Sequence, residues 1–172
     1  MVHGAGSTVG YAAAQIALLR GMRVIATAGP TYAQRLRDLG AEVTSYGDGM
    51  AERIGAISAG PVDLVLDTAP VGGALPDLVR VAGGDPGRVL TCGGSVPEAA
   101  ELGVRDTFHE DRTRPPADAL PEFTRLAADG RFSIPIAGTF ALEEWQAAFN
   151  SSEGGQARGK LLLLPGGARA NN

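Results

Sequence analysis

Short apolar runs alternate along the chain with segments whose apolar residues recur at helical spacing. The helical segments end at glycines, beginning with residues 8–20 before Gly21. After an apolar stub at the start of the chain, runs of buried-strand type lie at residues 23–28, 42–46, 62–69 and 88–92, and a sixth short strand is expected at 103–108. The order of elements is therefore βαβαβαβαβ.

Strands that are apolar on both faces need a parallel sheet covered by helices on both sides. Because crossover connections between parallel strands are right-handed, the pattern predicts an α/β fold, a Rossmann-type doubly wound parallel sheet of about six strands. We expect this dinucleotide-binding domain to span 1–130. A C-terminal helix and strand extension follows at 131–165, in which "KLLLL" is a buried-type strand, and 166–172 form a disordered tail.

Composition and charge narrow the class of protein. With 44% hydrophobic and 20% charged residues, the chain is globular rather than disordered. The single cysteine, Cys92, excludes an internal disulfide framework, so we expect a cytoplasmic protein. No run approaches the roughly 20 apolar residues of a membrane span. The net charge of -4 and the scattered arginines argue against a nucleic-acid partner.

A glycine-bearing turn at the first strand-to-helix junction is the main candidate site. At this junction of a doubly wound sheet, backbone amides and the helix N-terminus face a pyrophosphate. The strict GxGxxG fingerprint fails, because Gly4 and Gly6 are followed by Val9, and the next glycine is Gly10. The hydroxyls of Ser7 and Thr8 at the tip of the turn either donate to phosphate or cap the helix.

The end of the second strand bears on the choice of cofactor. An acidic residue there would bind a ribose 2′-hydroxyl, but Thr27 and Ala28 occupy the position and the next acid is Asp38. A 2′-phosphate would meet no repulsion, and Arg35 lies on the following helix. We therefore predict NADP(H) rather than NAD(H), while Arg35 could equally be an ordinary solvated charge.

Several other chemistries do not fit the residues. The segment 154–160 mimics a nucleotide P-loop, but Leu161 stands where Ser or Thr must hold magnesium. None of the tyrosines is followed four positions later by a lysine, so the pair used by short-chain dehydrogenases is missing. One cysteine with His3 and His109 cannot supply a zinc cage, so no metal site is expected. No catalytic residue can be named.

The ordered succession of four stretches resembles the medium-chain dehydrogenase/reductase superfamily, and within it the zinc-independent quinone oxidoreductase-like branch. The stretches are "VHGAGSTVGYAAAQIALLRGMRVIATAG", "LRDLGAEV", "DLVLDTAPVGGALPDLVRVAGGDPGRVLTCGG" and "ADGRFSIPIAGTFALEEWQAAFNSSEGGQARGKLLLLP". The resemblance covers residues 1 to 165, and it is to the cofactor-binding domain only.

The resemblance, together with the spacing argument, implies a set of cofactor-binding residues. The pyrophosphate turn comprises Gly6, Ser7, Thr8 and Val9, although many family members have glycine in place of Ser7 and Thr8. The adenosine side comprises Thr27, Ala28, Arg35 and Tyr46. The ribose and nicotinamide side comprises Thr68, Ala69, Cys92, Gly93, Gly94 and Phe108.

Family members carry a barrel-like catalytic domain before this one, and none of it is in this chain. We therefore expect an exposed apolar face and strand edge near the C-terminus. Either the chain is a fragment, or a homodimer partner or a chain supplying that domain covers this face, or the C-terminal third folds back differently. The implied function is an NADPH-binding domain of an oxidoreductase that transfers hydride to a small-molecule quinone or α,β-unsaturated carbonyl. The alternatives are a non-catalytic nucleotide-binding or partner-docking module and an enoyl-reductase fragment of a larger synthase.

Overall fold

A computed structural model describes residues 1–93, 96–107, 118–155 and 157–166. The chain divides into two compact units, Met1–Phe132 and Ser133–Asn172. Gly94, Phe108, His109 and most of the predicted tail, from residue 167 on, lie outside the described residues. Among the described helices, none combines the length and the apolar character that crossing a membrane requires.

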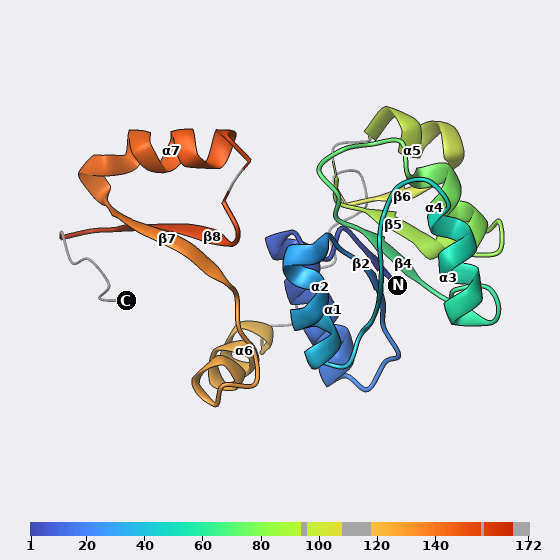
Figure 1. The fold of residues 1–172 in the computed structure, drawn as a ribbon, viewed down its shortest axis with the longest axis horizontal. Helices are drawn as coiled ribbons and strands as arrows, with labels where there is room; N and C mark the ends of the chain where they lie inside the picture. The colour runs from blue at the N-terminus through green and yellow to red at the C-terminus, as the bar shows by residue number, and fades with distance from the viewer. Residues whose placement is uncertain (94–95, 108–117, 156, 167–172) are drawn as a thin grey trace. The chain divides into compact units, whose positions relative to one another are not determined.

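The first unit is built on a six-stranded sheet in which all neighbouring strands run parallel (Figure 1). The strand order is β3-β2-β1-β4-β5-β6, which is the order of a doubly wound dinucleotide-binding sheet. The predicted fold class is thus confirmed. The strands are β1 (Val2–His3), β2 (Ile25–Thr27), β3 (Glu42–Thr44), β4 (Val65–Asp67), β5 (Val89–Thr91) and β6 (Arg105–Asp106).

Helices connect these strands. They are α1 (Thr8–Leu19), α2 (Pro30–Asp38), α3 (Met50–Ser58), α4 (Leu75–Val81), α5 (Val96–Leu102) and α6 (Ala119–Ala128), with a short 3₁₀ turn η1 (Pro86–Arg88) before β5. Helix α1 confirms the segment predicted at 8–20, and α2, α3, α4 and α6 likewise end two residues before a glycine, as the pattern predicts. Helix α6 is tied to the end of α1 by an ion pair between Arg20 and Glu122 at 2.8 Å.

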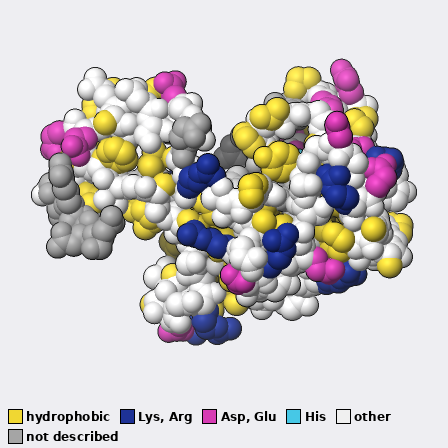
Figure 2. All heavy atoms as spheres, in the orientation of Figure 1, with side chains coloured by type: hydrophobic (Ala, Val, Ile, Leu, Met, Phe, Trp, Pro, Cys, Tyr) yellow, Lys and Arg dark blue, Asp and Glu magenta, His cyan; other side chains and the backbone are white. Residues whose placement is uncertain are grey.

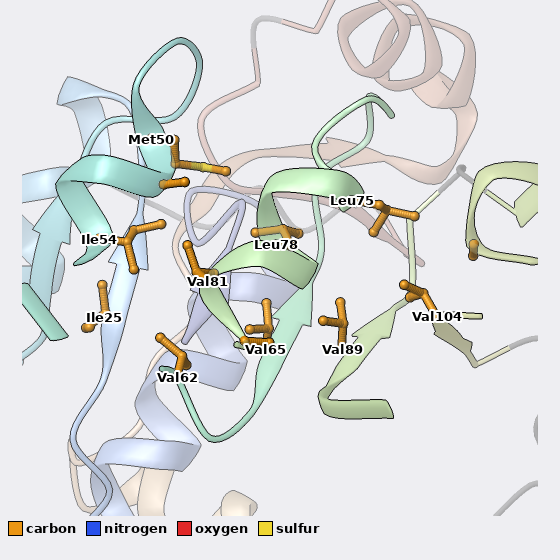
Figure 3. Close-up of a cluster of buried hydrophobic side chains, with 13 residues drawn as sticks. Ile25, Met50, Ile54, Val62, Val65, Leu75, Leu78, Val81, Val89 and Val104 are labelled. Atoms are coloured by element: carbon orange, nitrogen blue, oxygen red, sulfur yellow. The ribbon is translucent and has the colours of Figure 1, made fainter. Parts of the chain in front are cut away.

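Apolar side chains cover the sheet on both faces, as the apolar composition of the strands predicts. Helices α1 and α2 pack one cluster, in which Leu36 is fully buried. Helices α3, α4 and α5 pack the other, with Ile54 and Leu78 at its centre (Figure 3). Burying a large aliphatic side chain stabilises a fold by about 1.5–3 kcal/mol. These two clusters therefore hold the strand ends in place.

The second unit is a single βαβ motif. Strands β7 (Ile136–Ala141) and β8 (Lys160–Leu164) pair in parallel, and η2 (Leu142–Glu144) with α7 (Trp145–Glu153) forms the connection. Helix α7 contacts both strands. Hydrophobic side chains reach the surface of this unit (Figure 2), and the large exposed ones are Ile136, Leu142, Trp145, Phe149 and Leu163.

The strand predicted at "KLLLL" forms as β8, but it is not buried within this unit, which agrees with the expected exposed apolar face near the C-terminus. Leu161, Leu162 and Leu164 are only half-buried, and Leu163 is 41% exposed. A run of leucines predicts a strand with both faces covered. Here the sheet has two strands and one covering helix, which cannot bury side chains on both faces of β8.

Candidate functional site

The turn between β1 and α1 folds tightly against the end of β4. Gly4 has a φ of +74°, a conformation that side-chain-bearing residues rarely adopt. A Cβ added to Gly4 would lie 2.7 Å from the backbone nitrogen of Ala69. The amide of Ala5 donates to the carbonyl of Thr27 at 2.9 Å, which joins the turn to β2 as well.

Gly10 is the glycine that lets helix α1 approach the sheet. A Cβ there would lie 2.5 Å from both the carbonyl oxygen of Gly4 and the hydroxyl oxygen of Thr68. In the dinucleotide fingerprint the third glycine has this packing role. Although the spacing differs by one residue from the strict motif, Gly10 therefore meets the same steric requirement.

The hydroxyl of Ser7 serves as the cap of α1. Its Oγ accepts a hydrogen bond from the amide of Gly10 at 3.0 Å and donates to Thr68 Oγ1 at 3.2 Å. Thr68 Oγ1 in turn donates to the carbonyls of His3 at 2.8 Å and Gly4 at 3.0 Å. Of the two roles considered for Ser7, the structure shows the helix cap.

Three amides at this turn point to what it can bind. The first amides of an α-helix lack intrahelical acceptors. Those of Gly10 and Tyr11 are satisfied by the side chain and carbonyl of Ser7. Those of Gly6, Thr8 and Val9 have no acceptor within the described part of the chain. Such amides at a helix N-terminus favour an anion, because the helix dipole adds to their partial charges.

A row of polar side chains crosses the carboxyl ends of all six strands, and we call it the polar row. Its register follows the ladder, with Thr27 opposite Thr44, His3 opposite Asp67, and Thr91 between Asp67 and Asp106. Except for half-buried Thr44, its members are buried. The polar row consists of Thr44, Thr27, His3, Asp67, Thr91 and Asp106.

Hydrogen bonds link the members of the polar row to the loops that follow the strands. Thr91 Oγ1 donates to Asp67 Oδ2 at 2.9 Å and accepts from the amide of Gly93 at 3.1 Å. Asp67 Oδ1 accepts from the amide of Ala69 at 3.0 Å. A Cβ on Gly93 would lie 2.4 Å from the carbonyl oxygen of Ala69, so these two loops touch. The polar row thereby fixes the backbone after β4 and β5.

The pKa values of two groups at this edge of the sheet differ from their ordinary values. Burial lowers the pKa of His3 below its usual 6.5, and the nearby Asp67 carboxylate opposes that change. His3 Nδ1 lies 2.8 Å from Thr27 Oγ1, whose oxygen also accepts from the amide of Gly4. Burial, assisted by Asp67, raises the pKa of the Cys92 thiol. Cys92 is therefore a protonated, weakly nucleophilic thiol at neutral pH.

A hollow of about 570 Å³ opens beyond the ends of β2 and β3. It is lined by Ala28, Gly29, Pro30, Ala33, Gln34, Arg37, Val43, Thr44, Ser45 and Tyr46. Among the described residues, its lining carries one cation, Arg37, and no carboxylate. A Cβ on Gly29 would lie 3.6 Å from the Tyr46 hydroxyl, so the Tyr46 ring approaches the start of α2.

The predicted site residues are distributed unevenly over this edge. Ala28 and Tyr46 line the hollow, whereas Thr27 is fully buried beneath it in the polar row. The guanidinium of Arg35 lies 5.9 Å from the ring centroid of Tyr32, and Arg35 does not line the hollow. Arg37 lines the hollow instead. Its place in the same helix as Arg35 is the sequence signal that could have identified it.

The residues near the ends of β4 and β5 lie together. Thr68 contacts the glycine turn, and the amide of Cys92 donates to the carbonyl of Asp67 at 2.9 Å. The sequence analysis did not identify the polar row. Its signal was the polar residue that ends nearly every predicted apolar run, as at Thr27, Asp67 and Thr91.

A metal site was tested on the described residues. Within residues 1–93, 96–107, 118–155 and 157–166, no three His, Cys, Asp or Glu side chains are grouped so that they could hold a metal ion. The imidazole of His3 and the thiol of Cys92 are both engaged in hydrogen bonds. We therefore derive no chemistry through a metal from these residues.

Solved structures with the same fold come from several oxidoreductases. A protein of Sinorhizobium meliloti 1021 assigned to the alcohol dehydrogenases is 28% identical, with a TM-score of 0.70 over 95% of this chain and 47% of that one. The enoyl reductase CurK is 26% identical, with a TM-score of 0.71 over 95% and 53%. A quinone oxidoreductase of Pseudomonas syringae pv. Tomato DC3000, at 20% identity and a TM-score of 0.67 over 95% and 55%, shows the fold alone.

The chain spans about half the length of these solved structures. No curated protein sequence matches it significantly. The family model of the zinc-binding dehydrogenases matches residues 39–163, which is most of the chain. With the doubly wound sheet and the glycine turn already described, this chain therefore belongs to the zinc-binding dehydrogenase family of the medium-chain dehydrogenase/reductase superfamily.

Proposed function

We propose that this chain is the NADP(H)-binding domain of an oxidoreductase that reduces a quinone or an α,β-unsaturated carbonyl. The observation that carries the proposal is the glycine turn, which is closely packed at Gly4 and Gly10 and in which the amides of Gly6, Thr8 and Val9 have no acceptor among the described residues. A pyrophosphate would supply those acceptors. Membership of a dehydrogenase family supports a nicotinamide cofactor.

The preference for a 2′-phosphate rests on the adenosine side. The hollow at the ends of β2 and β3 has Arg37 in its lining, together with the polar side chains of Gln34, Ser45 and Tyr46. A carboxylate there would select a free 2′-hydroxyl, and the lining contains none. We assign Arg37 as the cation that pairs with the 2′-phosphate, in preference to Arg35.

The nicotinamide, when bound, supplies hydride to an electrophilic carbon of the substrate. The chain's own residues would bind and orient it. In this proposal Thr68, Ala69, Cys92 and Gly93 line the nicotinamide side, where Asp67 and Thr91 hold the backbone of the two loops. Gly94 and Phe108 complete the proposed set from outside the described residues. The substrate site and the proton donor would lie on another domain.

Calorimetric titration with NADPH and NADH tests the proposal. We expect NADPH to bind at least tenfold more tightly, a difference of about 1.4 kcal/mol, and Arg37→Met to remove most of that preference. Arg35→Met is the matched control, since it removes a neighbouring guanidinium outside the hollow. Failure to bind either nucleotide would overturn the proposal, and tighter binding of NADH would overturn its 2′-phosphate part.

A second candidate function is favoured by one comparison. The 26% identity to the enoyl reductase CurK supports an enoyl-reductase domain of a larger synthase. Steady-state NADPH oxidation by the complete protein, with a quinone, a simple enone and an enoyl thioester in parallel, separates the two, because an enoyl-reductase domain of a synthase is expected to turn over the thioester alone. Nucleotide binding without turnover of either acceptor would instead support a non-catalytic nucleotide-binding module.

The surroundings of the domain are part of the proposal. We place the enzyme in the cytoplasm, since its single cysteine, Cys92, is a free thiol. The exposed Leu142, Trp145 and Phe149 support covering of the second unit by another polypeptide. That polypeptide would be a second copy of the protein or a chain that carries a substrate-binding domain.

A further inference from the structure

The side chain of Arg53 holds the loop after β3 by its backbone. Its Nη1 donates to the carbonyl of Asp48 at 2.7 Å, and its Nη2 donates to that of Ser45 at 3.1 Å. Longer contacts of 3.4 Å join Nη2 to the carbonyls of Tyr46 and Gly47. Nε lies 3.2 Å from Thr44 Oγ1, to which it donates. One guanidinium thus reaches every residue from 44 to 48, a segment we call the clasped loop.

The clasped loop needs contacts that fix it, because glycines give its backbone wide conformational freedom. Gly47 has a φ of +83°, and Gly49, which precedes α3, has a φ of +72°. Glycine loses more conformational freedom on ordering than any other residue. A planar guanidinium presents its N–H donors in a fixed geometry, which suits it to fixing several carbonyls at once. Arg53 forms no ion pair within the described part of the chain.

The clasped loop forms one wall of the hollow described above. Thr44, Ser45 and Tyr46 belong to both. The side chain of Tyr46 is 60% exposed, so packing does little to hold it, and its position follows that of the loop backbone. Arg53 itself is not among the lining residues.

We infer that Arg53 is a positioning residue for the adenosine side of the cofactor site, where it sets nucleotide affinity by fixing the clasped loop and the Tyr46 ring. This inference rests on the proposed function, and it adds a residue that does not touch the nucleotide. Its basis is the geometry of the guanidinium rather than its charge. A lysine, which keeps the charge but lacks the planar fork, should not replace it.

Titration with NADPH and with adenosine 2′,5′-bisphosphate tests the inference on Arg53→Met and Arg53→Lys. We expect both variants to bind both ligands about tenfold more weakly than the unaltered protein. Arg80→Met is the matched control, because Arg80 is an exposed arginine with ion pairs to Glu52 and Asp77 and lies outside the hollow. Its affinity for both ligands should be unchanged.

A double-mutant cycle separates positioning from a general loss of stability. If Arg53 acts through the clasped loop, Arg53→Met should cost much less affinity in a Tyr46→Ala background than in the unaltered protein. Equal losses in both backgrounds, or an Arg53→Lys variant that binds as the unaltered protein does, would overturn the inference. Should Arg53→Met fail to fold, Arg53→Lys still decides between geometry and charge. If the unaltered protein binds neither ligand, the proposed function fails instead.

Discussion

At the scale of single residues, the first turn requires glycine at two positions, and the steric reason differs between them. Gly4 needs its left-handed backbone, whereas Gly10 lies within α1 and needs the absence of a side chain. The space that a methyl group would fill at Gly10 is already occupied by the carbonyl of Gly4 and the hydroxyl of Thr68. These atoms also belong to the network that caps α1, so a shift there moves the whole turn.

We predict that Gly10→Ala destabilises the protein by about 1–3 kcal/mol, the usual cost of overpacking, and weakens NADPH binding. Gly55→Ala is the control, because Gly55 also lies within a helix and its added Cβ would meet nothing within 4 Å. That variant should gain about 0.5–1 kcal/mol from helix propensity. Urea denaturation measures both values, and equal behaviour of the two variants would contradict the steric argument.

His3 makes the stability depend on pH. Because burial lowers its pKa in the folded protein, the unfolded chain takes up a proton below pH 6.5 that the folded protein does not. Stability due to the neutral imidazole is therefore present above 6.5 and is lost as the pH falls. The loss should approach about 1.4 kcal/mol per pH unit at most.

The variant His3→Asn isolates this effect, since asparagine stays neutral at all pH values. Denaturation curves between pH 7 and pH 5 should show a smaller loss of stability for the variant than for the unaltered protein. Parallel pH profiles for the two proteins would show that His3 does not titrate in this way.

At the scale of the element, the second unit has one covered and one open side. Helix α7 packs on β7 and β8 through residues such as Ala148, which is buried. Trp145 and Phe149 of the same helix are each more than half exposed. Because the three residues recur at i, i+3 and i+4, they form one apolar stripe that is only partly covered, which is typical of an element that has a second neighbour.

Because Trp145 is the protein's only tryptophan, its fluorescence reports on this surface. We predict emission close to that of a hydrated indole and efficient quenching by acrylamide in the isolated chain. Addition of a partner that covers α7 should shift the emission to shorter wavelength. A blue-shifted, protected tryptophan in the isolated chain would contradict the exposure described here.

Helices and strands could be predicted from the sequence where the apolar pattern was long or where a strand was apolar on both faces. Helix α1 and strand β4 follow directly from their apolar spacing. Helix α5 was missed, because it has seven residues and its few apolar positions, such as Ala99 and Leu102, make no clear period. A leucine run does not by itself reveal how many neighbours a strand has, so the exposure of Leu163 in β8 could be expected only from the family resemblance.

The candidate site was predictable only where neighbours in sequence are neighbours in space. The turn at Gly4 to Val9 is local, and so its place at the first strand end could be derived. The polar row depends on the lateral register of six strands, which spacing along the chain does not determine. The contact of Arg53 with backbone carbonyls leaves no signal in the sequence, because every residue has a carbonyl.

At the scale of the whole molecule, the two units differ in what a nucleotide can stabilise. All described residues of the proposed cofactor set belong to the first unit, Met1–Phe132. A ligand that binds only the folded form raises the free energy of unfolding by about 2.7 kcal/mol at a concentration one hundred times its Kd. The gain in stability on nucleotide binding should therefore be confined to the first unit.

Hydrogen exchange with and without NADPH measures this directly. We expect slower exchange at the glycine turn and in the clasped loop, and unchanged exchange in β7 and β8. Slower exchange throughout the second unit would show that the nucleotide acts on both units.

Strand β1 lies in the middle of the sheet although it is the first of the six strands to be synthesised. Val2 pairs with Ala26 on one side and with Leu66 on the other. On the ribosome, β2 and β3 can join β1 early, but its second edge stays open until β4 emerges. Ser7 likewise lacks its partner Thr68 until then. The nascent chain therefore cannot complete the glycine turn before the fourth strand has left the exit tunnel.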